Sequence, residues 1–233
     1  MGSEVMDLEQ LARYLRRDVR EVARLANRGY LPGRKVGGEW RFSRAEITHW
    51  VETQMHAYTE EELANLEGRP AGEEPEPIIG TLLTEACIAV PLLARTKNSV
   101  LEELVGVAER SWQVYDRDAI LTALKQREEM GSTALESGVA IPHPRRPLPN
   151  AVGESIVAYA RTLAGIPFGA PHGVLTDLFF LVCCRDDRTH LRTLARLSRL
   201  FLRPGLLDEL RAADTPSETY QVLEAAERDL IGR

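Results

Sequence analysis

The residues best suited to chemistry lie in the stretch 131–144, GSTALESGVAIPHP, where one histidine, His143, stands between two prolines. A proline fixes its own φ, lacks an N–H and holds the residue before it in an extended conformation. Pro142 therefore extends Ile141, and Pro144 does the same to His143. The apolar run before Pro142 has the character of a β-strand, and strand pairing usually stops at a proline. The pattern predicts an imidazole held at the open end of a sheet with little backbone freedom.

Four roles are open to such a histidine from the residues alone. It could be a hydrogen-bonded core residue, a metal ligand, a general base or a nucleophile that becomes covalently modified. A metal site needs several ligands in workable geometry, and His172 and His190 are distant from His143 in sequence. No serine or cysteine stands in a nucleophile-elbow pattern. We therefore expect neither a metal nor another cofactor.

The neighbours of His143 are of types that bind anions. Backbone N–H groups, hydroxyls and guanidinium groups are the donors that a phosphoryl group on an imidazole needs. The sequence supplies them on both sides of the histidine, in Arg127, Gly131, Ser132, Thr133, Arg145 and Arg146. His190, near the start of a predicted helix, would add a donor where the helix terminus favours negative charge.

Alternating strands and helices must position these residues. From residue 78 onward, helical periodicity marks 97–110, 118–129 and 188–202, and strand-like runs are ACIAVPLL, 138–141, SIVAYA and LTDLFFLVCC. This alternation predicts an α/β domain with a mixed sheet and flanking helices over 78–233. One helix carries a stripe of arginines that we expect to be a solvated face, with docking of an acidic partner or of DNA as the alternatives: Arg192, Arg196, Arg199 and Arg203.

The first part of the chain, 1–58, has the signals of a winged helix-turn-helix. Asp7 and Asp18 each begin a capping pattern ahead of a short amphipathic helix, and Gly37–Gly38 fits a two-residue hairpin turn. A third helix follows Ser43. The second helix and the hairpin would expose residue types that contact phosphates and base edges, namely Arg20, Arg24, Asn27, Arg28, Arg34, Lys35 and Arg41. A solvated face on a protein-docking module is the alternative.

Charge and composition agree with two modules. The net charge is −6, but 13–44 holds ten Lys/Arg against three Asp/Glu, whereas 60–77 holds seven Glu against one Arg. We interpret 59–77 as a short helix and an acidic linker. Three cysteines and the lack of any apolar run of membrane-spanning length predict a cytoplasmic chain without a membrane span.

Two resemblances extend this interpretation. The segment RGYLPGRKVGGEWRF and the helix SRAEITHWV after it resemble the excisionase-like winged-helix relatives of the mercury-resistance regulators. That resemblance implies binding of double-stranded DNA, and a module of this size usually binds as a pair, so a homodimer is expected.

The segment REEMGSTALESGVAIPH resembles the active-site segment of bacterial phosphotransferase system enzyme IIA domains of the fructose/mannitol and nitrogen-regulatory class. The similarity extends over about 78–233 and includes Lys97 in ARTKNSVLEELV. It implies that His143 is phosphorylated by a histidine-containing phosphocarrier protein and that His190 assists. It also places Arg127, Ser132 and Thr133 at the phosphate. Pro144 departs from the family's small residue and removes one N–H donor, for which Arg145 is a possible replacement.

Together these features predict a bacterial regulator that joins a DNA-binding domain to a phosphorylatable enzyme IIA-like domain. Two alternatives remain open from the sequence. The chain could be a plain phosphocarrier in sugar uptake whose N-terminal module contacts proteins. It could also be a DNA-binding protein whose IIA-like half is a sensor that is never phosphorylated.

Overall fold

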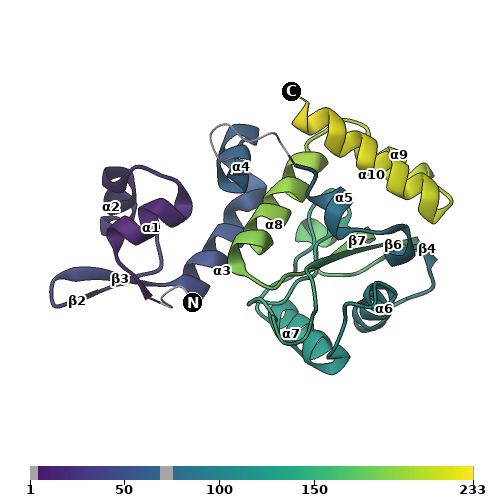
Figure 1. The fold of residues 1–233 in the computed structure, drawn as a ribbon, viewed down its shortest axis with the longest axis horizontal. Helices are drawn as coiled ribbons and strands as arrows, with labels where there is room; N and C mark the ends of the chain where they lie inside the picture. Colours follow the sequence, from purple (N-terminus) through teal and green to yellow (C-terminus); the bar gives the residue numbers. More distant parts are fainter. Residues whose placement is uncertain (1–4, 69–75, 233) are drawn as a thin grey trace.

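The computed structural model describes residues 5–68 and 76–232, which form two parts (Figure 1). A small helical unit with a three-stranded sheet is followed by a larger unit built on a four-stranded sheet. The helices that connect the two parts pack against the larger unit, beside its helix α8 (Figure 1).

The small unit has the predicted winged helix-turn-helix arrangement. Helix α1 (Leu8–Leu15) begins at the Asp7–Gln10 capping box, and α2 (Val19–Asn27) begins at Asp18, whose carboxylate accepts two backbone N–H groups. Strands β1 (Val5–Met6), β3 (Glu39–Ser43) and β2 (Arg34–Val36) pair antiparallel in that order. Gly37 and Gly38 form the hairpin turn with φ of 62° and 87°, values that glycine adopts without strain. The hairpin is the predicted wing.

Helix α3 (Arg44–Gln54) completes the small unit and continues toward the larger one. Ile47 and Val51 are fully buried, as helical spacing requires of an inward face. A short 3₁₀ turn (Met55–Ala57) ends the helix, and α4 (Glu60–Glu67) begins at the Thr59–Glu62 capping box. Of the predicted acidic linker, 69–75 lies outside the described residues, and the predicted domain boundaries stay predictions.

The larger unit is a mixed sheet with helices on both sides. Its strand order is β4 (Ile88–Leu92), β6 (Ile156–Ile166), β7 (Thr176–Cys183) and β5 (Val139–Ala140). The β6–β7 pair is antiparallel, and the two outer pairs are parallel. The central strands are buried on both faces and include Tyr159 and Phe180, whose rings meet edge to face at 4.8 Å.

The flanking helices confirm the predicted periodicity. Helices α6 (Lys97–Glu109) and α7 (Arg117–Glu129) lie below the sheet in Figure 1, and α8 (Asp187–Phe201) and α10 (Pro216–Ile231) lie above it. Two short helices, α5 (Ile79–Leu82) and α9 (Leu206–Ala212), carry too few periodic positions to be predicted. In the ranges that the structure describes, no helix combines the length and apolar character needed to span a membrane.

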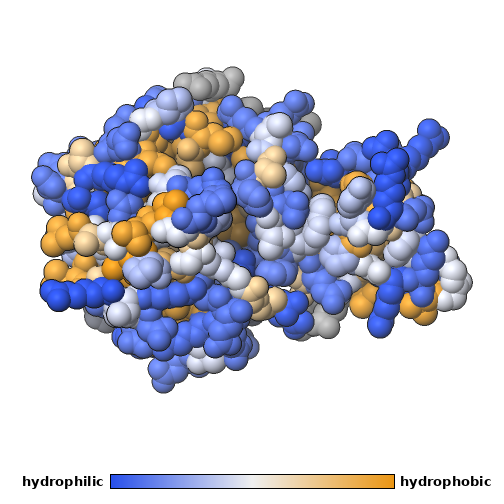
Figure 2. All heavy atoms as spheres, turned by 180° about the vertical axis from the view of Figure 1, so that it is seen from behind, coloured by the Kyte–Doolittle hydropathy of each residue, from blue (hydrophilic) through white to orange (hydrophobic). Residues whose placement is uncertain are grey.

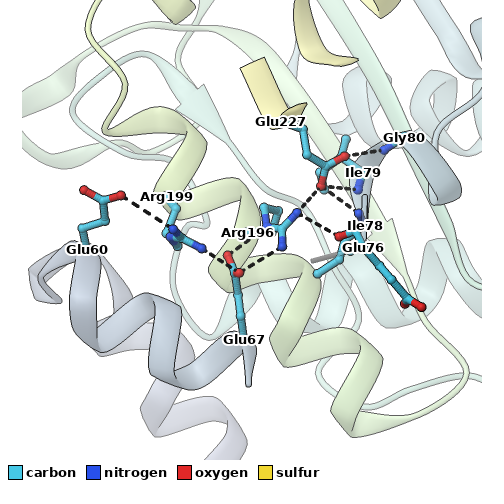
Figure 3. A network of polar contacts seen from close by, with 9 residues as sticks. All are labelled: Glu60, Glu67, Glu76, Ile78, Ile79, Gly80, Arg196, Arg199 and Glu227. Atoms are coloured by element: carbon cyan, nitrogen blue, oxygen red, sulfur yellow. Dashed lines mark hydrogen bonds and ion pairs between the residues drawn. The ribbon is translucent and has the colours of Figure 1, made fainter. Parts of the chain in front are cut away.

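The arginine stripe of α8 is not the solvated face that the sequence predicts. Arg196 is 4% exposed and forms a bidentate ion pair with Glu67 of α4, at 3.0 and 3.1 Å (Figure 3). Arg199 also contacts Glu67, at 2.8 Å. Helix α4 covers this part of α8, so Arg196 and Arg199 pair with a buried carboxylate instead of facing water, whereas Arg203 pairs with the exposed Asp229 at 3.3 Å.

A second buried carboxylate completes this network. The Glu227 carboxylate of α10 accepts a hydrogen bond from Arg196 at 2.6 Å (Figure 3). It also accepts hydrogen bonds from the backbone N–H groups at the start of α5, those of Ile78, Ile79 and Gly80. We call the four side chains Glu67, Arg196, Arg199 and Glu227 the α4 clamp. Their two positive and two negative formal charges balance, which a buried charge cluster requires.

Candidate functional site

His143 follows β5 on the chain, where the prolines were expected to hold it. The backbone stays in register past the strand, because the Pro142 carbonyl accepts the N–H of Val182 at 3.0 Å. The expectation that the imidazole lies at an open end of the sheet is wrong, since His143 is only 4% exposed. Helix α3 of the small unit covers the sheet end, and its Glu52 contacts the imidazole.

The hydrogen bonding of His143 determines which ring nitrogen can react. Nδ1 lies 2.6 Å from the carbonyl oxygen of Ile141, a contact that requires a proton on Nδ1. Burial lowers the pKa of His143 by more than the neighbouring Glu52 carboxylate raises it. The ring is therefore neutral near pH 7, with the lone pair on Nε2.

Three side chains from distant segments lie around the His143 ring. His190, in the first turns of α8, lies with its ring centroid 5.2 Å from that of His143. Arg127, at the end of α7, is 5% exposed and donates to the Gly131 carbonyl at 2.9 Å. Glu52 lies 3.2 Å from His143 Nε2, 2.7 Å from His190 Nε2 and 3.7 Å from Arg127 Nε. The structure thus brings together the three residues predicted to be catalytic.

The site holds one carboxylate, that of Glu52, beside a positively charged imidazole, that of His190. Burial alone would lower the pKa of His190, but hydrogen bonds with Cys184 and Glu52 raise it to about 10. Burial opposes ionisation of Glu52 as well, yet His143, His190 and His49 hold its pKa well below the usual range. At neutral pH the Glu52 carboxylate is therefore paired with the His190 imidazolium, and each of the two side chains is only 2% exposed.

The side-chain contacts of the predicted phosphate-binding residues Ser132 and Thr133 are made outside the site. The Ser132 hydroxyl donates to the Phe168 carbonyl at 2.9 Å, and the Thr133 hydroxyl binds Glu128, which also pairs with Lys97 at 2.7 Å. These contacts shape the turn before β5. Arg145 is half-buried, and its Nε has no hydrogen-bond partner among the described residues. The three roles at phosphate stay predictions.

A metal ion is the other occupant that such donors suggest. Glu52, His143 and His190 each offer one ligand-type atom, all within 4.8 Å of one another. Arg127 stands beside the same carboxylate, however, and His190 holds a proton. The positive charge already present favours an anion in this position over a cation.

Glu52 is the functional residue that sequence analysis missed. It lies on the third helix of the small unit, where His49 and Glu46 are similarly polar, and a helix-surface glutamate is usually solvated. The partners of Glu52 are far along the chain, and no local sequence pattern predicts such a contact.

The residues predicted to bind DNA lie on one small unit with accessible side chains. Arg20, Arg24, Asn27 and Arg28 are exposed on or just after α2, and Arg34 and Lys35 are exposed on β2. Arg41 is half-buried on β3 and pairs with Glu39 at 2.7 Å. Figure 2 shows strongly hydrophilic side chains projecting from the outer edge of this unit, at the right. Helix α3, not α2 or the wing, faces the larger unit.

The Glu52–His190 pair makes stability depend on pH. Because the pKa of His190 is raised from 6.5 to about 10, its contribution is complete below pH 6.5 and is lost as pH rises through about 10. The pKa of Glu52 is lowered from 4.5, so its contribution is complete above pH 4.5 and is lost as pH falls further. We expect the melting temperature of wild type to exceed that of Glu52→Gln most between about pH 5 and 6.5, and the difference to shrink as pH rises through about 10.

Differential scanning calorimetry across this range measures the effect. Glu46→Gln, an exposed change on the same helix, is the matched control and should show no such profile. A wild-type advantage that stays constant from pH 5 to 10 would contradict the assigned charges.

Comparison with known proteins identifies both parts. The family described as "Phosphoenolpyruvate-dependent sugar phosphotransferase system, EIIA 2" matches residues 81–226, and a helix-turn-helix domain family matches 5–55. The fructose-specific EIIA component of Haloferax volcanii is 32% identical over 147 residues, which cover 62% of this chain and 94% of that protein. The fructose-specific EIIABC component of Bacillus subtilis is 28% identical over 147 residues, 62% of this chain but only 23% of that longer protein.

A solved structure supports the same assignment. The crystal structure of nitrogen regulatory protein IIA-Ntr from Neisseria meningitidis has a TM-score of 0.57 at 27% identity, covering 63% of this chain and 99% of its own. Both resemblances stated from the sequence are confirmed. Since the EIIA match covers more than half of the residues, this chain belongs to the EIIA 2 family of the phosphoenolpyruvate-dependent sugar phosphotransferase system, and a helix-turn-helix domain precedes its EIIA domain.

Proposed function

We propose that the chain is a regulator whose EIIA domain accepts a phosphoryl group on His143 from a histidine-containing phosphocarrier protein, and whose first domain binds double-stranded DNA. One observation carries the phosphoryl part. His143 is neutral, its Nδ1–H is held by the Ile141 carbonyl, and its unprotonated Nε2 lies in a buried site that also holds the cationic groups of His190 and Arg127, both in contact with Glu52.

The transfer is an in-line displacement at phosphorus. The Nε2 lone pair of His143 forms the new N–P bond while the bond from phosphorus to the carrier's imidazole breaks, and that electron pair stays on the carrier's nitrogen. The Nδ1 proton remains in place, because the Ile141 carbonyl stabilises the positive charge that develops on the ring. His190 and Arg127 neutralise the phosphoryl oxygens, and such positioning and charge neutralisation supply most of the catalysis in phosphoryl transfer.

The experiment is incubation of the full chain with labelled phosphoenolpyruvate and the two upstream carrier proteins. We expect a label stable to alkali and lost in acid, as an N–P bond requires, and dependent on the phosphocarrier. Absence of label after prolonged incubation with active carriers would favour the alternative of a sensor that is never phosphorylated.

The DNA-binding part rests on the exposed basic residues of α2 and the wing. A recognition helix and an adjacent wing that both present arginine and lysine can contact base edges and the phosphate backbone. The alternative, a phosphocarrier whose first module contacts only proteins, predicts no duplex binding by the full chain. Dimerisation on two half-sites and a cytoplasmic location remain part of the proposal.

The dependence of duplex affinity on salt tests this assignment. Removing one phosphate contact reduces the slope of log affinity against log salt by about 0.9. We expect this change for Arg24→Ala, measured by fluorescence anisotropy over a range of salt concentrations. Arg95→Ala, an exposed change on the EIIA domain, is the control and should leave the slope unaltered. Equal slopes for both variants and wild type would remove Arg24 from the interface.

A further inference from the structure

The feature that the proposed function leaves unexplained is the carboxylate at the reacting nitrogen. Glu52 comes from α3 of the helix-turn-helix domain, whereas His143, His190 and Arg127 belong to the EIIA domain. The Glu52 side chain is 2% exposed and contacts all three. One domain therefore places an anion in the phosphoryl site of the other.

Glu52 and a phosphoryl group cannot occupy this position together. Glu52 Oε2 lies 3.2 Å from His143 Nε2, so phosphorus and its oxygens on that nitrogen would take the space that the carboxylate fills. A phosphoryl group also brings a charge of about −1.5 to −2, which a carboxylate at this distance would repel. The donors that neutralise either anion are the same.

The site holds the carboxylate imperfectly. His190 makes a hydrogen bond to Glu52 at 2.7 Å, but Glu52 Oε2, His143 Nε2 and Arg127 Nε are buried without hydrogen-bond partners in the part of the chain described. A buried polar group without a partner costs free energy. In the phosphorylated form His143 Nε2 would bond to phosphorus, and a phosphoryl oxygen can accept from Arg127 Nε, the donor that the carboxylate leaves unpaired.

The polar contacts between the domains outside Glu52 are of both signs. Arg44 of α3 pairs with Asp187 of α8 at a distance of 4.0 Å. Against this, burial and the nearby charges of Arg188 and Arg192 lower the pKa of Arg16, which shows like charges facing each other across the contact. Loss of the Glu52 contacts therefore removes the buried polar attraction that holds α3 on the EIIA domain.

The α4 clamp determines which segment can move. Glu67 holds α4 on α8 through Arg196 and Arg199 (Figure 3), and no hydrogen bond or ion pair among the described residues joins these three side chains to Glu52 or His143. Helix α3 is separated from α4 by the 3₁₀ turn Met55–Ala57 and by Tyr58, which is extended. A change at His143 can thus detach α3 and the DNA-binding domain while α4 keeps them tethered.

From these contacts we propose that Glu52 is an internal competitor of the phosphoryl group: it docks the DNA-binding domain on the unphosphorylated EIIA site, and phosphorylation of His143 displaces it and releases that domain. This inference rests on the proposed function, because it requires that His143 accept a phosphoryl group.

The test compares initial phosphorylation rates of wild type, Glu52→Ala and the control Glu46→Ala, using labelled phosphoenolpyruvate and the carrier proteins. We expect Glu52→Ala to be labelled at least about tenfold faster than wild type, which corresponds to about 1.4 kcal/mol of competition. Glu46→Ala, exposed on the same helix, should match wild type. An equal or slower rate for Glu52→Ala overturns the inference and leaves the proposed function standing. No label on any variant overturns the proposed function, and the inference with it.

Small-angle X-ray scattering supplies an independent measurement on full-length protein. We expect the radius of gyration of wild type to increase on phosphorylation, and that of His143→Ala to stay constant under the same treatment. Circular dichroism establishes that each variant is folded. An unchanged radius in fully phosphorylated wild type would show that the domains stay docked and would overturn the release.

Discussion

Replacing His143 by alanine is expected to abolish phosphorylation, so that the variant carries no detectable label when wild type is fully labelled. The expectation follows from the geometry, since within the described residues Nε2 of His143 is the nitrogen that combines a free lone pair with cationic neighbours on a neutral ring. His190 cannot replace it, because its Nε2 holds a proton that Glu52 accepts. Labelling as described above, followed by peptide mapping, measures the result.

The matched control for this variant is His172→Ala. His172 lies in the 3₁₀ turn Pro171–Gly173 with its side chain 82% exposed. We expect no phosphoryl group on it, so His172→Ala should carry as much label as wild type. The fold of His143→Ala should persist, since Glu52 still pairs with His190. Undiminished labelling of His143→Ala would move the phosphorylated residue elsewhere and remove the basis of the proposed function.

Replacing Glu67 by alanine is expected to lower the free energy of unfolding by about 3–5 kcal/mol, the cost of removing one partner from a buried ion pair. Arg196 would lose its bidentate partner and Arg199 its closest one, and both would stay in a region that α4 covers. Glu227 neutralises only one of the two cations. Urea unfolding monitored by circular dichroism gives the free energy.

Glu60→Ala is the control for Glu67. Glu60 pairs with Arg199 at 3.6 Å with its side chain 57% exposed, and exposed pairs contribute about 1 kcal/mol at most. A loss in Glu67→Ala no larger than that in Glu60→Ala would show that α4 does not clamp the EIIA domain. The phosphorylation site would be unaffected in either case, because the clamp does not touch it.

Local signals in the sequence predict most of this fold. The capping residues Asp7 and Asp18 each begin a helix as expected, and Gly37–Gly38 forms the wing turn. Such signals succeed because the residues that make the contact are within a few positions of one another. The placement of His143 after a short strand was predictable for the same reason.

Contacts between the two domains were not predictable from local patterns. Glu52 lies 138 residues from His190 in sequence, and Glu67 lies 129 residues from Arg196. Each is a glutamate on a short helix, and such a side chain is usually exposed to water. Their burial depends on where the two domains pack, and periodicity carries no information about that. The arginine stripe was misinterpreted for this reason, since its partner is a helix of the connecting segment.

The tethered carboxylate also decides which chemical signals the EIIA site can register. Since Glu52 is part of the same chain, its effective concentration at the site is of millimolar order. A free anion with the same intrinsic affinity for the site, such as a small carboxylic acid, must exceed that concentration to enter, and dilution reverses its binding. A phosphoryl group on nitrogen is bound covalently and does not dissociate in this way. The chain would therefore respond to the supply of activated donor and ignore the ambient level of anions.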